Sequence, residues 1–126
     1  MSRFYLYFNA ALYLVLGLWC TLAPSQTAHL LGYEALSAGG ASEYLVIYGG
    51  MELGFAAFFF FCAQRGQQLG IVFSLCIYTP VVLWRWPSMA AHWPVSATTL
   101  ATAVFEVILL LAAIILWRRR PRNIFR

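Results

Sequence analysis

The sequence predicts an all-α integral membrane protein, folded as one domain over residues 1–126 into a four-helix bundle that runs up-down-up-down. Its composition is the first observation, because 63% of the residues are hydrophobic and only 10% are charged, which lies outside the range of ordinary soluble domains. The second is that four apolar segments each reach the length of about 20 residues needed to cross a bilayer. So small a chain cannot bury this much apolar surface within itself, so most of it must face lipid or neighbouring helices.

The four predicted spans cover residues 4–22, 44–63, 69–86 and 97–117. Helix-breaking residues bound them, namely Pro24, Gly66, Pro87, Pro94 and Pro121. The apolar run of the first span is longer than that of a signal peptide, and Pro24 disfavours cleavage after Ala23. We therefore expect the first span to be retained.

The arginines predict the orientation of the bundle, because positive charge accumulates in cytoplasmic segments. Arg3, Arg65 and five arginines after the fourth span share one side, whereas only Arg85 falls on the other. Both termini are thus predicted to be cytoplasmic, with 24–43 and 87–96 outside. The C-terminal arginines are Arg118, Arg119, Arg120, Arg122 and Arg126. Next to a span they indicate anionic lipid rather than nucleic acid, so the expected partners are the lipid bilayer and a second copy or a membrane protein.

Each span carries polar residues at the spacing of one helical face. The four stripes are Tyr5, Asn9 and Tyr13; Tyr48, Gly49, Glu52 and Ala56; Ser74, Tyr78 and Arg85; and Thr99, Thr102 and Glu106. Polar side chains inside a membrane are costly and usually face the interior of a bundle or a cavity. A polar seam is therefore expected through the middle of the bundle.

Two carboxyl groups lie within this seam. Glu52 and Glu106 both fall about 12 to 14 Å from the external end of their spans, at 1.5 Å per residue. If their faces converge, two ionised carboxylates would repel in a medium of low dielectric constant, so at least one should carry a proton. Arg85 either reaches out to water or turns inward to Glu106, and Tyr48 and Tyr78 offer hydroxyl donors.

We therefore expect a ligand or proton site formed by Glu52, Glu106, Tyr48, Tyr78, Arg85 and Asn9. Two alternatives remain open for the carboxyl groups. They either join helices by hydrogen bonds with no further role, or face lipid.

Glycines in the second span predict close helix packing. Gly50 and Gly54 form a small-xxx-small pair next to Gly49, and such pairs let helix backbones approach each other. We expect packing within the bundle, and contact with a second copy is the alternative.

No cofactor or metal site is indicated. The three cysteines do not form Cys-x-x-Cys, and His29 and His92 fall in loops rather than in spans, which argues against a redox pair, a zinc ribbon and an intramembrane haem. No Ser/His/Asp or Cys/His set and no phosphate-binding loop is found. An enzyme would have to rely on a quinone or a borrowed cofactor near the carboxyl groups.

The segment from Ser42 to Gly54, Ser-Glu-Tyr-Leu-Val-Ile-Tyr-Gly-Gly-Met-Glu-Leu-Gly, resembles the signature of an uncharacterised family of small bacterial four-helix membrane proteins related to DoxX. The resemblance extends to Gly17, Pro24 and Arg85. It implies a four-helix fold in the bacterial inner membrane and no established reaction. Where the family has an arginine after the aromatic residue, this chain has Leu45, so Arg85 would have to act as the counter-ion of the carboxyl group in the second helix.

Two functions follow from these residues. The first is the binding or translocation of a small ligand or proton at the polar site. The second is a non-catalytic accessory or structural subunit of a membrane complex, in which the seam only holds the helices together. A drug exporter of the small four-helix kind needs a carboxylate in the first span, where this chain offers only Asn9.

Overall fold

The computed structural model describes residues 1–119 and confirms an all-α fold, since every regular element in that range is helical. The elements are α1 (Ser2–Leu22), α2 (Pro24–Leu30), α3 (Ala38–Tyr44), the π-helix η1 (Leu45–Met51), α4 (Glu52–Arg65), α5 (Gln67–Ala91) and α6 (Ala97–Arg118). Four segments are long and apolar enough to cross a membrane, namely Ser2–Leu22, Ala38–Arg65, Gln67–Ala91 and Ala97–Arg118. The chain is thus built as a multi-pass membrane protein. The predicted breaker Pro121 and Arg120, Arg122 and Arg126 lie outside the described residues.

Two boundaries differ from the prediction. The second membrane segment begins at Ala38 rather than at residue 44, because the Ser37 hydroxyl accepts the Gly40 N–H at 3.1 Å and caps the helix there. The third continues to Ala91, so the prediction that Pro87 ends it was wrong. Membrane helices tolerate an internal proline because neighbouring groups can satisfy the freed carbonyl.

The short helix α2 was not predicted. Pro24 stands at its first turn, where the missing N–H costs nothing and the fixed φ favours a helix. The Thr27 hydroxyl donates to the Ala23 carbonyl at 2.9 Å, which also satisfies a group at the start of the helix. Pro24 therefore both ends α1 and begins α2.

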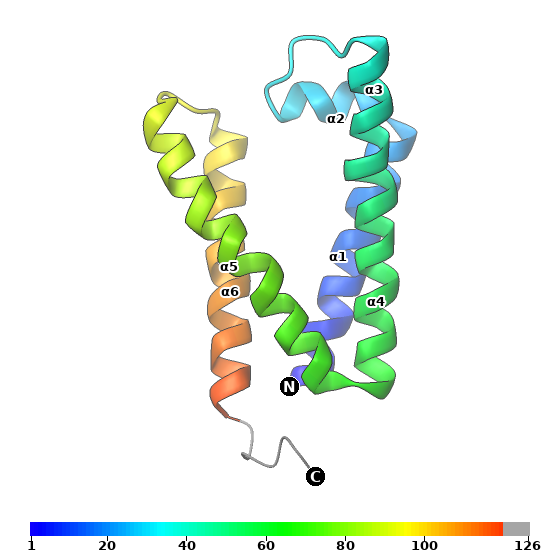
Figure 1. The fold of residues 1–126 in the computed structure, drawn as a ribbon, viewed down its shortest axis with the longest axis vertical. Coiled ribbons are helices and arrows are strands. Elements are labelled where there is room, and N and C mark those ends of the chain that lie inside the picture. Colours follow the sequence, from blue (N-terminus) through cyan, green and yellow to red (C-terminus); the bar gives the residue numbers. More distant parts are fainter. Residues whose placement is uncertain (120–126) are drawn as a thin grey trace.

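The long helices form two antiparallel hairpins. In Figure 1, α1 lies beside the continuous column of α3, η1 and α4, while α5 lies beside α6, and these are the most extensive helix contacts. The short connection at Gly66 joins the hairpins, which converge at that end and diverge toward α2 and α3. The start of α1 and the end of α6 lie at the same end of the molecule, as an up-down-up-down course requires.

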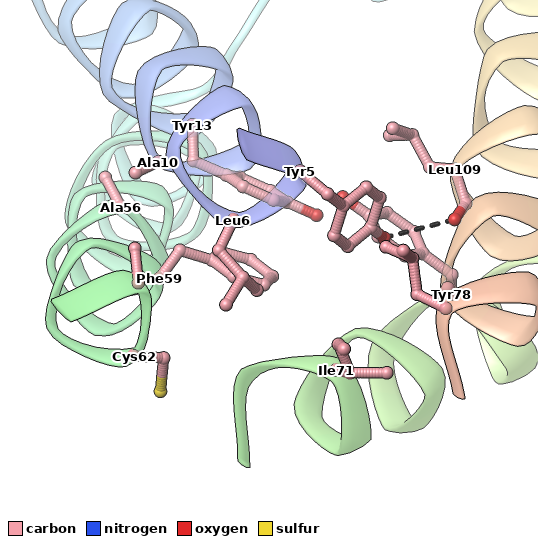
Figure 2. Close-up of a cluster of buried hydrophobic side chains, with 13 residues drawn as sticks. Tyr5, Leu6, Ala10, Tyr13, Ala56, Phe59, Cys62, Ile71, Tyr78 and Leu109 are labelled. Carbon is pink, nitrogen blue, oxygen red and sulfur yellow. Dashed lines mark hydrogen bonds between the residues drawn. The ribbon is translucent and has the colours of Figure 1, made fainter. Parts of the chain in front are cut away.

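The main hydrophobic core lies between α1 and α4 and is closed at one end by α5 (Figure 2). Aromatic rings fill it: Tyr13 stacks on Phe59 with ring centroids 5.5 Å apart, and Phe73 of α5 packs against Phe59 at 5.3 Å. Phe59 is fully buried. Since aromatic pairs favour stacked and edge-on contacts, this cluster holds the two hairpins together where they converge.

Glycines permit the closest helix contacts. Of the three glycines predicted to pack closely, Gly49, Gly50 and Gly54, only Gly49 makes such a contact. A Cβ added to Gly49 would lie 2.6 Å from Thr21 Oγ1 of α1, whereas Gly50 and Gly54 have no neighbour within 4 Å. The prediction that Gly50 and Gly54 pack within the bundle was therefore wrong, because both face outward. A similarly tight approach occurs at Gly70, where an added Cβ would lie 2.7 Å from Leu6.

Candidate functional site

A hydrogen-bonded network of buried polar side chains joins the two hairpins. The Tyr78 hydroxyl of α5 donates to Asn9 Oδ1 of α1 at 2.5 Å, and Asn9 Nδ2 donates to the Tyr5 carbonyl at 2.8 Å. The Tyr5 hydroxyl then donates to the Leu109 carbonyl of α6 at 3.1 Å (Figure 2). Asn9 is fully buried, and both ends of its amide are satisfied, as burial away from water requires.

The network has a clear origin in the sequence. Tyr5 and Asn9 are one turn apart on α1, so they face the same neighbours. Ser74, also fully buried, lies one turn before Tyr78 on α5, and its hydroxyl donates to the Gly70 carbonyl at 2.8 Å. These residues link α1, α5 and α6 near the end where the hairpins converge.

The only salt bridge among residues 1–119 joins α5 to α6. Arg85 Nε and Nη2 donate to Glu106 Oε2 and Oε1 at 2.5 and 2.6 Å, so the pair is bidentate. The side chain of Glu106 is 13% exposed and that of Arg85 is 32% exposed. Of the two predicted positions for Arg85, the inward one is found. Such a two-pronged contact matches the planar guanidinium to the carboxylate, and it lies wholly within one hairpin.

Glu52 opens α4 directly after the π-helix and has no such partner. Its Oε2 atom is buried and makes no hydrogen bond within residues 1–119. The Cβ atom of Glu52 lies against Gly17 of α1, and a Cβ added to Gly17 would lie 3.2 Å from it. The absence of a side chain at Gly17 therefore leaves room for Glu52. Arg85 is engaged by Glu106, so it is not the ion-pair partner of Glu52 in this structure. A buried oxygen without a partner is costly, and it needs a proton, a cation or another donor.

Two further tyrosines of the polar stripes belong to the same hairpin as Glu52. Tyr13 of α1 is buried and stacks on Phe59 of α4. Tyr48 of η1 precedes Glu52 in the chain and stacks on Tyr44. Glu106 is paired within the other hairpin, so the two carboxyl groups have different surroundings.

The predicted site residues therefore divide into three groups. Arg85 and Glu106 are paired, Asn9 and Tyr78 belong to the network, and Glu52 stands alone next to Tyr48. Tyr78 donates to Asn9 rather than to either carboxyl group, so its predicted role as a carboxyl donor was wrong. Thr99 and Thr102 bond only within the start of α6.

Sequence reasoning placed Tyr5, Tyr13 and Ser74 on polar stripes but left them out of the site. Tyr5 and Tyr13 lie one helical turn from Asn9, and Ser74 lies one turn from Tyr78, and this spacing indicates that they share a face with those residues. Their roles depend on which helices become neighbours.

A surface groove of about 570 Å³ lies elsewhere. It follows α1 and α4, and its lining is apolar, with Tyr7, Ala11, Ala57 and Phe60 among its residues. Tyr7 and Ala11 are each two positions away from Asn9, so their side chains point to another face of α1. The groove contributes none of the polar groups above.

No group of three metal-binding side chains occurs within residues 1–119. The sequence of the chain matches no family model and no curated protein, and its fold matches no solved structure. The resemblance to DoxX-related proteins stays a prediction.

Proposed function

We propose that this membrane protein binds a proton or another small ligand at Glu52, in a polar site completed by Tyr13, Tyr48 and the network around Asn9. The observation that carries the proposal is the buried, unpartnered Oε2 atom of Glu52 within a membrane-spanning segment. Acidic residues at such positions are costly and commonly mark pathways for ions, protons or ligands. A carboxyl group can take up a proton or coordinate a cation without rearranging the helices.

The surroundings of Glu52 suit that role. Arg85 and Glu106 neutralise each other, whereas Glu52 makes no salt bridge within residues 1–119. Tyr78 donates to Asn9, and Asn9 donates to the Tyr5 carbonyl. This row of polar groups extends from α5 to α1 near the end where the hairpins converge. We infer that translocation of a proton would follow it.

Infrared difference spectroscopy of the purified protein tests this function. A protonated carboxyl group gives a carbonyl band whose intensity should change with pH in the wild type, disappear in Glu52→Gln and persist in Glu106→Gln. Glu106→Gln is the matched control because it removes the paired carboxyl group of α6. A spectrum without a titrating carbonyl band, or a band that survives Glu52→Gln, would exclude Glu52 as the proton site.

The proposal includes a location. We place the protein in the bacterial inner membrane as a member of the DoxX-related group, with both termini in the cytoplasm, on the basis of the arginine distribution and the 42–54 segment. A reporter fused after Arg126 should be active only in its cytoplasmic form. External activity would reverse the orientation.

A second candidate is an accessory subunit of a membrane complex. Gly50 and Gly54 favour it, because both face outward with no neighbour within 4 Å and would let another helix approach closely. Purification in mild detergent should then recover a defined partner, and Gly54→Leu should release it. Reproducible recovery of the chain alone would rule this function out.

A further inference from the structure

A second pocket lies where the loop after α2 meets α3 and η1. Its volume is about 220 Å³, and its walls include Tyr33, Leu36, Glu43, Tyr44, Ile47 and Tyr48. Tyr48 also adjoins the Glu52 site, but the other residues belong to neither the network nor the ion pair. The pocket combines three aromatic rings with one carboxylate.

The three rings form one continuous aromatic group. Tyr44 and Tyr48 stack with their centroids 4.7 Å apart, and Tyr33 meets Tyr44 edge-on at 6.2 Å. The Tyr44 hydroxyl donates to Thr27 Oγ1 of α2 at 2.9 Å, and Tyr44 is only 4% exposed. This bond fixes the central ring before any ligand arrives, which lowers the entropic cost of binding.

The charge at this end of the molecule is negative. Glu43 lines the pocket and is exposed, and Glu34 lies on the adjoining loop. Residues 4–64 contain no arginine or lysine, and Arg85 of the other hairpin is occupied by Glu106. The faces of tyrosine rings are themselves negative. The carboxylate and the rings therefore attract the same kind of ligand.

We propose that this pocket binds a small organic cation of the quaternary ammonium class. Aromatic rings attract such cations through their faces, and their apolar methyl groups suit aromatic walls. Glu43 supplies the compensating charge. A calcium or magnesium ion would need six or more oxygen ligands, whereas the carboxylate oxygens here come from one residue. The proposal does not rest on the function of Glu52.

Titration of the purified full-length chain with tetramethylammonium, by calorimetry in uncharged detergent, tests the pocket. Glu43→Gln and Tyr33→Leu should each weaken binding at least about fivefold, as expected from losing one charge or one cation–π contact. Glu34→Gln is the matched control. It removes the same charge from the same end of the molecule but does not line the pocket, so its affinity should stay within about twofold of wild type.

Equal weakening by Glu34→Gln and Glu43→Gln would show a general surface charge effect and overturn the proposal, as would no detectable binding. Glu43→Gln keeps the test valid if Tyr33→Leu disturbs the fold, because Glu43 is exposed. Glu52→Gln should retain tetramethylammonium binding even if it loses its carbonyl band, so the two proposals can fail separately.

Repeating the titration in lipid nanodiscs of equal net charge distinguishes a lipid headgroup from a soluble cation as the natural ligand. Weaker tetramethylammonium binding in phosphatidylcholine than in phosphatidylethanolamine would identify a choline headgroup as the competing ligand. Equal affinity in both lipids would point to a soluble cation. Either result supports the pocket as a cation site.

Discussion

The ion pair between Arg85 and Glu106 offers the most direct energetic test of the structure. Glu106→Gln preserves the size of the side chain but leaves the guanidinium without a counter-charge. A charged arginine at the centre of a membrane helix costs about 2.5 to 3.5 kcal/mol. Arg85 is 32% exposed and can direct its long side chain toward water, so part of that cost is avoided. We expect Glu106→Gln to lower the free energy of unfolding by about 1 to 3 kcal/mol.

Two companion variants make this prediction specific. Replacing both partners, as Arg85→Leu with Glu106→Leu, should cost much less than Glu106→Gln, because no unpaired charge is left behind. Glu52→Gln should be neutral or stabilising, because the buried Oε2 atom has no hydrogen bond to lose. The measurement is equilibrium unfolding in mixed detergent, followed by the fluorescence of the five tryptophans. If Glu52→Gln destabilises as much as Glu106→Gln, the assignment of the paired and unpaired acids is refuted.

Two further predictions concern packing. Gly70→Ala should destabilise the protein by about 1 to 3 kcal/mol, because the new Cβ would lie 2.7 Å from Leu6 and 2.8 Å from Cys62 Cβ. Gly54→Ala should leave the stability unchanged, because its new Cβ meets no neighbour. Equal losses of stability in unfolding experiments on the two variants would contradict the observed packing. Tyr78→Phe should cost about 1 to 3 kcal/mol, because it leaves the fully buried Asn9 oxygen without its donor. A Tyr78→Phe variant as stable as wild type in the same assay would show that the network adds nothing.

The four spans were predictable because length and hydropathy act locally. Each segment must satisfy its own backbone groups as a helix in lipid, whatever its neighbours are. The helix α2 was not predicted because a proline after an apolar span indicates the end of a helix. A proline at the first turn of a helix loses no hydrogen bond, so the same residue both ended α1 and began α2.

The orientation of the glycines could not be read from spacing. Gly49 and Gly50 are adjacent, yet only Gly49 meets α1. Which of two neighbouring positions faces a partner depends on the rotation of the whole helix about its axis. Small-xxx-small spacing identifies a face that permits close approach, but the approach occurred at Gly17, Gly49 and Gly70.

The buried stripes of the candidate site were predicted correctly for Tyr5, Asn9, Ser74 and Tyr78, because each helix has one face turned inward. Among the partners, only the Arg85–Glu106 pair was one of the predicted alternatives. The bundle consists of two hairpins that meet at one end, so residues at equal depth need not meet. Glu106 pairs within its own hairpin, whereas Glu52 belongs to the other.

The π-helix supplies the local reason why Glu52 was hard to place. Leu45–Met51 uses the wider i to i+5 turn, so a stripe drawn with regular helical spacing does not relate Tyr48 correctly to Glu52. The wider turn places Gly49 against α1 and ends directly at Glu52, the first residue of α4. π-helical turns occur frequently at functional sites. Here the π-helix contributes Ile47 and Tyr48 to the cation pocket and ends directly before the unpaired acid Glu52. The segment that departs from regular helix geometry therefore connects the two proposed sites.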